Sequence, residues 1–245
     1  MYAPSAAQPG DELPVLLWIP GGGFIIGGEI GGGQYNGSSF VEAAGGEVIV
    51  VSLQYRVGSL GFLHSPEAGV RGNLGLLDQR LAMEWVRDEI SAFGGDSQKV
   101  TLFGESAGAI SVCVHLTSVA SQRLFRAAIM ESGVCDSDAF FNTPAVAAAY
   151  GDSFVKYVGC EGAQPEAVLS CLQSLPVDRA SAPVLFPHST RNATRFSLPS
   201  LAPVIGWTPT LDGTVIEQSP LDAIRKQVGC AAPRHLSSRR RPGSL

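Results

Sequence analysis

The sequence has few basic residues and no long apolar run. Its 245 residues include only three lysines, and the formal net charge is −5. Proteins that bind nucleic acid present a basic patch or stripe, and none occurs here before the last few residues, so we do not expect nucleic acid as a partner. The longest apolar runs, such as Val15 to Ile19 and Val48 to Leu53, are strand-sized and far below the roughly 18 residues of a membrane helix. We therefore expect no membrane span.

Nucleotide-binding motifs are also missing. A P-loop ends in Gly-Lys-Ser or Gly-Lys-Thr, whereas none of the lysines (Lys99, Lys156 and Lys226) follows a glycine. The G-x-G-x-x-G pattern of dinucleotide-binding folds does not occur in residues 21–36. These absences disfavour nucleotide binding, and we expect neither a cofactor nor a metal ion.

Glycine is in excess, on a background typical of a globular protein. Hydrophobic residues make up 45% of the chain, which excludes disorder, and 29 residues are glycine. Eight of these glycines lie between Gly21 and Gly33. Because glycine weakens regular structure, such a cluster indicates a place where the backbone adopts positive φ or approaches another group closely. A flexible loop is the alternative interpretation.

Strand and helix patterns alternate along the chain. Apolar runs at 13–20, 47–54, 99–103 and 125–130 are typical of buried parallel strands. Helices are expected over 73–90, 107–116, 144–158 and 165–175. In the first of these helices, Leu74, Leu77, Leu81 and Trp85 recur at three and four residues and form the expected buried face. The alternation predicts a doubly wound, mostly parallel α/β sheet with helical insertions.

The pentapeptide Gly104-Glu105-Ser106-Ala107-Gly108 lies between a predicted strand and a predicted helix. This is the context of a nucleophile elbow, a tight turn that presents a serine hydroxyl outside the backbone. A serine that attacks an ester carbonyl creates an oxyanion, which preorganised backbone N–H groups stabilise. We expect Ser106 to be the nucleophile, and the amides of Gly22, Gly23 and Ala107 to be the oxyanion donors.

Ordered motifs along most of the chain carry a family resemblance. They are Trp18-Ile-Pro-Gly-Gly-Gly-Phe24, Tyr55-Arg-Val-Gly58, Asn73-Leu-Gly-Leu-Leu-Asp-Gln-Arg80, Ala92-Phe-Gly-Gly-Asp96, Val100-Thr-Leu-Phe-Gly-Glu-Ser-Ala-Gly108, Phe125-Arg-Ala-Ala-Ile-Met-Glu-Ser-Gly133 and Leu211-Asp-Gly213. From Leu13 to Lys226 the chain resembles the type-B carboxylesterase/lipase family of α/β-hydrolases, which includes cholinesterases and fungal esterases. The resemblance implies a carboxylic-ester hydrolase with a serine acyl-enzyme, Glu105 as the supporting neighbour of Ser106, and a small-molecule or lipid ester as substrate.

The resemblance also bears on the cysteines. It implies a disulfide between Cys160 and Cys171, for which two buried thiols are the alternative. Cys113, Cys135 and Cys230 are expected to be unpaired.

The resemblance further suggests a secreted protein. In that compartment Asn36-Gly-Ser38 and Asn192-Ala-Thr194 would be candidate glycosylation sites. The N-terminal residues of this chain have neither the charged region nor the apolar region of a signal peptide.

The histidines do not complete a catalytic triad. A serine nucleophile needs a histidine to take its proton and an acid to orient that histidine. On this fold both follow the serine, which leaves His115, His188 and His235, and none of these follows an acid-bearing strand loop. We interpret His115 and His64 as structural, and the triad acid and histidine stay unassigned. Compared with the family, the chain is expected to lack segments at both ends and to have little or no turnover.

Three regions are expected along the chain. They are an N-terminal extension over 1–12, a partial α/β-hydrolase domain over 13–227 and a basic, disordered tail over 228–245. The rival class is a non-catalytic relative used for adhesion or partner binding. Such relatives usually lose the nucleophile, whereas Ser106 is present, which favours the hydrolase.

Overall fold

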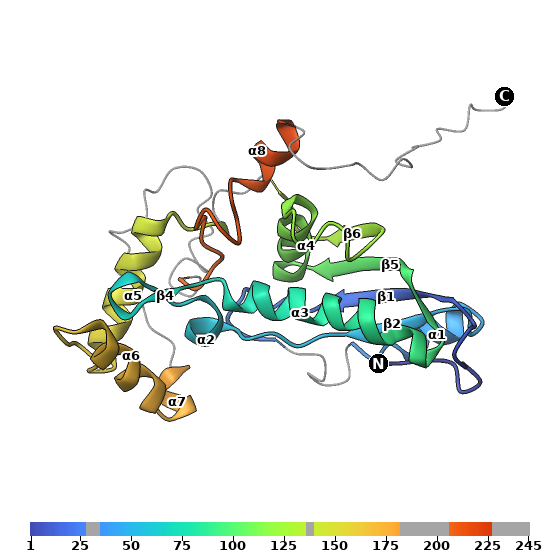
Figure 1. Cartoon of the computed structure of the whole chain (residues 1–245), viewed down its shortest axis with the longest axis horizontal. Coiled ribbons are helices and arrows are strands. Elements are labelled where there is room, and N and C mark those ends of the chain that lie inside the picture. The colour runs from blue at the N-terminus through green and yellow to red at the C-terminus, as the bar shows by residue number, and fades with distance from the viewer. Residues whose placement is uncertain (28–34, 136–139, 182–205, 227–245) are drawn as a thin grey trace.

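The computed structural model describes residues 1–27, 35–135, 140–181 and 206–226 (Figure 1). Its main sheet has the order β2-β1-β5-β6 and consists of β1 (Leu13–Ile19), β2 (Ile49–Ser52), β5 (Gly95–Glu105) and β6 (Ala127–Glu131). All three strand pairs are parallel. This arrangement confirms the mostly parallel α/β sheet predicted from the apolar strands.

Eight α-helices are described. They are α1 (Ser38–Ala43), α2 (Gly58–Phe62), α3 (Leu74–Glu89), α4 (Ala107–Thr117), α5 (Pro144–Tyr157), α6 (Pro165–Ser174), α7 (Val177–Ala180) and α8 (Pro220–Arg225). Two 3-10 turns, η2 (Pro66–Ala68) and η3 (Ile90–Phe93), and an antiparallel pair of β3 (His64–Ser65) with β4 (Val70–Arg71) complete the described elements.

Different helices cover the two faces of the sheet. On one face, Leu17 of β1 lies in a core cluster with Val86 of α3 and Val112 of α4. On the other face Leu16, its neighbour along β1, packs with Val41 of α1. Successive side chains of a strand point to opposite faces, so α3 and α4 cover one face and α1 covers the other. The sheet is doubly wound, as the sequence predicts.

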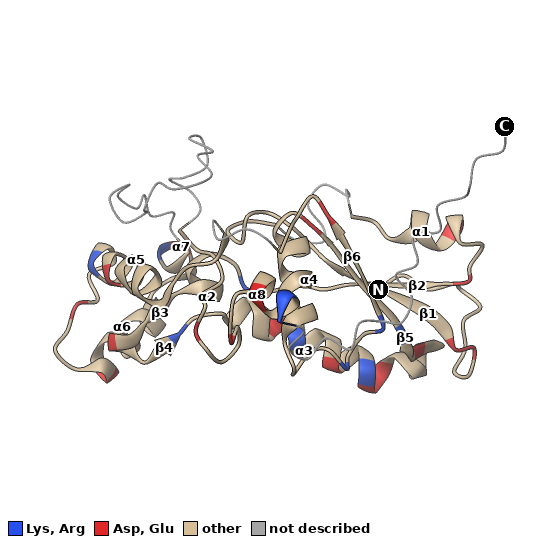
Figure 2. Ribbon diagram, turned by 90° about the horizontal axis from the view of Figure 1, so that it is seen from above, with Lys and Arg blue, Asp and Glu red and all other residues tan. Residues whose placement is uncertain are grey.

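The buried face of α3 differs from the prediction. Leu81 is 65% exposed and Trp85 is 42% exposed, whereas Gln79, Met83 and Val86 are fully buried. Two rows of residues on this helix have the helical period, and the row that packs on the sheet is the one that contains Gln79. Its side-chain amide is satisfied by hydrogen bonds from and to α4, which makes its burial possible. Charged residues of both signs lie along the outer side of α3 (Figure 2).

A second core lies beyond the carboxyl ends of the strands, where α5, α6 and α7 are grouped (Figure 1). Phe24, from the loop after β1, packs edge-on against Phe62 of α2 with ring centroids 5.1 Å apart. Phe154 of α5 packs edge-on against Trp207 at 5.4 Å. These helices are the insertions that the later part of the sequence predicts.

The segment after residue 206 is anchored by side-chain amides. Asn73 Nδ2 donates to the Thr210 carbonyl at 2.7 Å, and the Thr210 N–H donates to Asn73 Oδ1 at 2.8 Å. Asn142 Nδ2 donates to the Gly206 carbonyl at 3.1 Å. The carboxylate oxygen Oδ1 of Asp212 accepts hydrogen bonds from the backbone N–H groups of residues 214–216. These bonds explain the polar residues in the Asn73 and Leu211 motifs.

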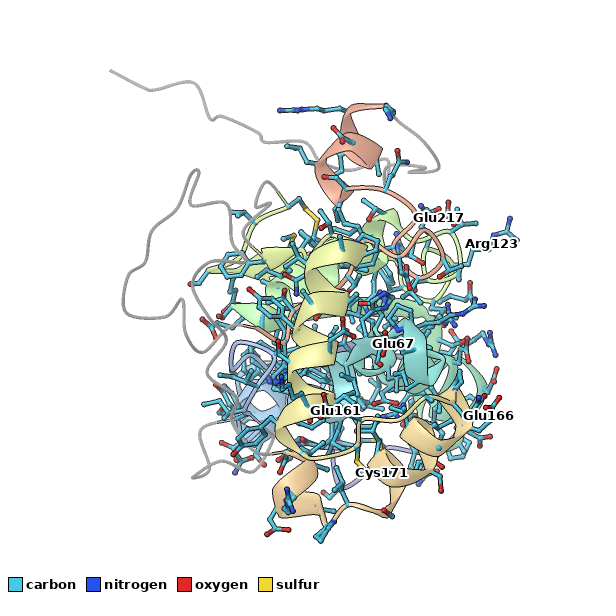
Figure 3. The ribbon with its side chains drawn as sticks, turned by 90° about the vertical axis from the view of Figure 1, so that its left-hand side faces the viewer. Glu67, Arg123, Glu161, Glu166, Cys171 and Glu217 are labelled. Atoms are coloured by element: carbon cyan, nitrogen blue, oxygen red, sulfur yellow. A yellow bond between two sulfur atoms is a disulfide. The ribbon has the colours of Figure 1, made fainter. Side chains whose placement is uncertain are left out.

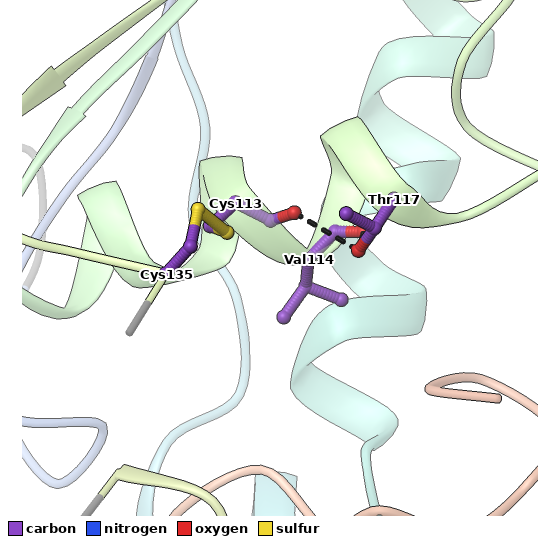
Figure 4. Close-up of a disulfide and its surroundings, with 4 residues drawn as sticks. All are labelled: Cys113, Val114, Thr117 and Cys135. Atoms are coloured by element: carbon purple, nitrogen blue, oxygen red, sulfur yellow. Dashed lines mark hydrogen bonds between the residues drawn. A yellow bond between two sulfur atoms is a disulfide. The ribbon is translucent and has the colours of Figure 1, made fainter. Parts of the chain in front are cut away.

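Four cysteines form two disulfides. The Cys160–Cys171 bond, whose α6 cysteine is labelled in Figure 3, confirms the predicted pairing. Cys113 is bonded to Cys135, so the prediction that both are unpaired is wrong (Figure 4). Cys113 lies on α4 and Cys135 follows β6, and only the packing of α4 against β6 brings them together. Cys230 lies outside the described residues.

The first residues of the chain contact the sheet. The Tyr2 N–H donates to the Val50 carbonyl at 2.7 Å, and the Val50 N–H donates to the Tyr2 carbonyl at 2.9 Å. The described part of the chain contains no helix long and apolar enough to cross a bilayer. The predicted tail, residues 228–245, lies outside the described residues.

Candidate active site

Ser106 lies in the sharp turn that joins β5 to α4. Its backbone has φ 54° and ψ −118°, and non-glycine residues rarely adopt a positive φ. Two hydrogen bonds hold the turn. The Ser106 N–H donates to the Glu131 carbonyl of β6 at 2.9 Å, and the Ile110 N–H donates to the Ser106 carbonyl at 3.0 Å. The strained residue is therefore fixed between the sheet and the helix.

The glycines on either side of the turn allow close packing against β1. A Cβ added to Gly108 would lie only 2.1 Å from the carbonyl oxygen of Ile19. One added to Gly104 would lie 2.7 Å from the carbonyl carbon of Gly108 and 2.8 Å from the Ile19 oxygen. Only residues without a side chain let α4 begin directly against the end of β1.

The loop after β1 reaches the same turn. A Cβ added to Gly21 would lie 2.6 Å from the Glu105 carbonyl oxygen, 2.9 Å from Glu105 Oε2 and 3.3 Å from Ser106 Cβ. Any larger residue at position 21 would push the loop away from the serine. The fold thus brings the glycine cluster next to Ser106, although 85 residues separate them in the sequence.

The glycine loop continues as a tight turn with positive φ. Gly22, Gly23 and Phe24 have φ values of 115°, 63° and 63°. The N–H groups of Ile25 and Ile26 both donate to the Gly22 carbonyl, at 3.2 and 3.1 Å. The described part of the cluster is therefore ordered by backbone hydrogen bonds, and residues 28–34 lie outside the description.

Three backbone N–H groups around the serine have no acceptor within the described parts of the chain: those of Gly22, Gly23 and Ala107. Ala107 is the first residue of α4, where N–H groups have no intrahelical partner and where the helix dipole is positive. Gly22 and Gly23 directly follow Gly21, at which an added Cβ would lie 3.3 Å from Ser106 Cβ. These are the three amides that the sequence analysis predicts as oxyanion donors.

Sequence reasoning assigned no role to Tyr55. Its hydroxyl donates to the Pro20 carbonyl at 2.9 Å, immediately before the glycine loop. Burial raises the pKa of this phenol, which stays a neutral donor. The next residue, Arg56, forms a two-pronged ion pair with Asp78 of α3, with Nη2 2.7 Å from Oδ1 and Nε 2.8 Å from Oδ2. In the sequence, only the Tyr55-Arg-Val-Gly58 motif of the family resemblance pointed to Tyr55 and Arg56.

Two carboxylates lie on neighbouring strands beside the turn. Glu105 precedes Ser106 and is half-buried, and the β5–β6 register pairs it with Glu131. Sequence reasoning selected Glu105 alone. Glu131 enters the site through its carbonyl, which accepts the hydrogen bond from the Ser106 N–H.

Neither described histidine contacts Ser106. His115 is buried on α4, nine residues from Ser106, which corresponds to roughly 13 Å along a helix. His64 Nδ1 is 2.8 Å from the Arg71 carbonyl oxygen in the β3–β4 pair. His188 and His235 lie outside the described residues. Within the described residues, no group of three metal-binding side chains occurs.

One of the two glycosylation sequons can be placed. Asn36 is exposed, just before α1, and its Oδ1 accepts a hydrogen bond from the Ser38 N–H at 2.9 Å. Asn192 lies outside the described residues.

Known proteins resemble this chain in sequence and in fold. The sequence model of the carboxylesterase family matches residues 1–237. Carboxylesterase 5A of Felis catus is 41% identical over 72% of this chain and 32% of its own length. A secreted triacylglycerol lipase of Gibberella zeae is 38% identical over 89% of this chain and 37% of its own length.

A solved carboxylesterase of Geobacillus stearothermophilus superimposes on the structure with a TM-score of 0.74 and 33% identity. The match covers 92% of this chain and 43% of that protein. The chain therefore spans less than half the length of the proteins that it matches.

Proposed function

The chain belongs to the carboxylesterase family, and on that premise we propose that it carries the nucleophile and the oxyanion donors of a carboxylic-ester hydrolase. The observation that carries the proposal is the close approach of Gly21 to Ser106, where an added Cβ would lie 3.3 Å from Ser106 Cβ. This approach brings the N–H groups of Gly22 and Gly23, which have no acceptor among the described residues, close to a serine whose backbone is strained. Strained residues persist where surrounding structure holds them, and they cluster at active sites.

In the proposed reaction, Ser106 Oγ attacks the carbonyl carbon of the ester. A bond forms between Oγ and that carbon, and the carbonyl electrons move to the oxygen. The amides of Gly22, Gly23 and Ala107 donate hydrogen bonds to this oxyanion. Collapse of the intermediate breaks the bond from the carbonyl carbon to the leaving oxygen, and this alkoxide becomes the alcohol by taking up the proton that the Ser106 hydroxyl loses. Water later hydrolyses the acyl-enzyme.

The serine proton requires a base, and the described histidines do not supply one at Ser106. We propose that Glu105 acts as a supporting carboxylate, since its Oε2 lies against Gly21. Because neither histidine of the described residues lies at Ser106, we expect the chain to turn over esters weakly or not at all. Oxyanion stabilisation and binding alone leave roughly 10³- to 10⁴-fold catalysis over water in serine proteases that lack triad members.

The substrate class follows from the chemistry of the site and from the relatives, which include a carboxylesterase and a triacylglycerol lipase. We propose a small-molecule or lipid carboxylic ester. Two disulfides and a secreted relative support an extracellular location, where Asn36 is the candidate for glycosylation. An exposed asparagine in a sequon is compatible with that modification.

A fluorophosphonate probe tests the proposal, because it phosphonylates activated serines. Peptide mass spectrometry is expected to find one adduct, on the peptide that contains Ser106, and none in Ser106→Ala. Ser153→Ala, which removes a hydroxyl on α5 that donates to the Ala149 carbonyl, is the matched control and should be labelled normally. Absence of labelling in the wild type would favour the rival, a non-catalytic adhesion or binding protein.

A further inference from the structure

A chain of buried hydrogen bonds ends one residue from Ser106. Ser121 Oγ lies 3.0 Å from His115 Nδ1, and His115 Nε2 lies 2.9 Å from Gln79 Oε1. Gln79 Nε2 donates to Ser111 Oγ at 3.1 Å. The Ser111 hydroxyl donates to the Ala107 carbonyl at 2.9 Å. We call the four side chains of Ser121, His115, Gln79 and Ser111 the relay.

The donors and acceptors of the relay can be ordered in one direction. Gln79 Oε1 can only accept, so His115 Nε2 carries a hydrogen, and in a neutral imidazole Nδ1 then accepts from the Ser121 hydroxyl. Burial, with a smaller contribution from the Arg80 charge, lowers the pKa of His115 to about 3, so the ring is neutral at physiological pH. Ser111 Oγ accepts a hydrogen bond from Gln79 Nε2, and the Ser111 hydroxyl donates one to the Ala107 carbonyl. Gln79, Ser111 and His115 therefore each donate one hydrogen bond and accept one, and the Ser121 hydroxyl donates one.

The relay is shielded from water and joins two helices. Gln79 and Ser111 are fully buried, and His115 and Ser121 are 2% and 1% exposed. Gln79 belongs to α3, whereas Ser111 and His115 belong to α4. In a low-dielectric interior such bonds are stronger than in water, and breaking one leaves a costly unpaired group.

We propose that the relay positions the Ala107 amide as an oxyanion donor, with Gln79, Ser111 and His115 as positioning residues. The inference rests on the proposed function. Ala107 contributes both the N–H group beside Ser106 and the carbonyl that the relay binds. A restraint on this residue fixes the first turn of α4 and thereby the direction of the N–H. Oxyanion donors act only when they are preorganised at the position where the charge develops.

The chain contains a matched control for this effect. Ser153 Oγ of α5 also donates to the carbonyl four residues earlier, that of Ala149, at 2.8 Å. No side chain from another helix donates to Ser153 among the described hydrogen bonds. Ser153→Ala therefore removes the same local bond as Ser111→Ala without breaking a connection between helices or a contact near Ser106.

The kinetics of fluorophosphonate labelling test the inference. We expect Ser111→Ala and Gln79→Met each to slow the bond-forming step at Ser106 about fivefold, with unchanged reversible affinity for the probe, while Ser153→Ala labels at the wild-type rate. Because both changes break one relay, the double variant should be slowed about as much as either single variant. Wild-type labelling in Ser111→Ala, or fully additive losses in the double variant, would overturn the inference.

Amide hydrogen exchange supplies a readout that does not depend on labelling. The Ile110 N–H, which donates to the Ser106 carbonyl, reports on the first turn of α4. Its exchange should accelerate in Ser111→Ala and Gln79→Met, and stay unchanged in Ser153→Ala. If the exchange rate of the Ile110 N–H is the same in all variants, the proposal that the relay positions the Ala107 amide is wrong, even if the wild type is labelled. Accelerated exchange together with an unlabelled wild type would instead reject the proposed function, and with it a catalytic purpose for the relay.

Discussion

The hydroxyl of Tyr55 donates a hydrogen bond to the carbonyl of Pro20 at 2.9 Å. This bond connects the segment after β2 with the end of β1, immediately before the glycine loop that contacts Ser106. The bond therefore restrains the start of the loop that carries the proposed donors Gly22 and Gly23. The relay restrains the third proposed donor, Ala107, through α3 and α4.

The first prediction concerns this bond. Tyr55→Phe leaves the Pro20 carbonyl without its partner, and we expect a loss of about 1 kcal/mol in the free energy of unfolding. Labelling of Ser106 should also slow, because the loop is less restrained. Tyr157→Phe, at a tyrosine that is 58% exposed, is the control. Equal stability and labelling rate in the two variants would contradict the role of Tyr55.

The second prediction concerns the close approach of α4 to β1. Gly108→Ala places a Cβ 2.1 Å from the Ile19 carbonyl oxygen, a backbone atom, so the elbow must shift. We expect a loss of about 1–3 kcal/mol in stability and no labelling of Ser106. Gly162→Ala, whose Cβ would meet only ordinary contacts beyond 3.4 Å, should be neutral. A stable and labelled Gly108→Ala would show that the turn is looser than described.

The third prediction concerns the disulfide between Cys113 and Cys135. It closes a loop with a sequence separation of 22, and in the chain-entropy description its removal costs ~3 kcal/mol. Replacement of both cysteines by alanine should lower the midpoint of urea unfolding accordingly. Alkylation of the folded, unreduced protein should leave both residues unmodified. Modification of Cys113 under these conditions would refute the pairing.

The fourth prediction concerns pH. The pKa of His115 is lowered to about 3 in the folded chain, from 6.5 as the ordinary value, so the unfolded chain binds one more proton between these limits. The stability that the neutral ring contributes is present above pH 6.5 and is lost as the pH falls towards 3. The stability difference between wild type and His115→Gln should shrink by about 2 kcal/mol between pH 7.5 and pH 5. A difference that is constant over this range would contradict the burial of a neutral ring.

The strands and the turn at Ser106 could be predicted because their signals are local. The runs that became β1, β2, β5 and β6 are mostly apolar, which is typical of strands in a parallel sheet. The pentapeptide Gly104–Gly108 predicts a turn, because an apolar run precedes it and a helical pattern follows it in the sequence.

The face of α3 could not be predicted because two stripes satisfy the helical period. The stripe with Leu81 and Trp85 is the more apolar one, yet the stripe with Gln79 is buried. The burial of Gln79 is stabilised by His115 and Ser111, which lie more than 30 residues away in the sequence. Trp85 instead lies near Phe93 on the outside, with ring centroids 5.9 Å apart.

The bond between Cys113 and Cys135 depends on the same kind of distant packing. Cys113 occupies an apolar helix, and nothing near it in the sequence distinguishes a disulfide from a buried thiol. The parallel pairing of β5 with β6 brings the end of β6 under α4, where a Cβ on Gly133 would lie 2.5 Å from Ala109 Cβ. Only this tertiary contact places Cys135 within bonding distance.

The central claim is that Ser106 is an acylated nucleophile, and trapping of the acyl group tests it most directly. With excess p-nitrophenyl butyrate, the chain should release one nitrophenolate per molecule in a single slow phase and carry one butyryl group on the peptide that contains Ser106. Ser106→Ala should show neither. Butyrylation of another residue, or an equal release of nitrophenolate by Ser106→Ala, would contradict the account.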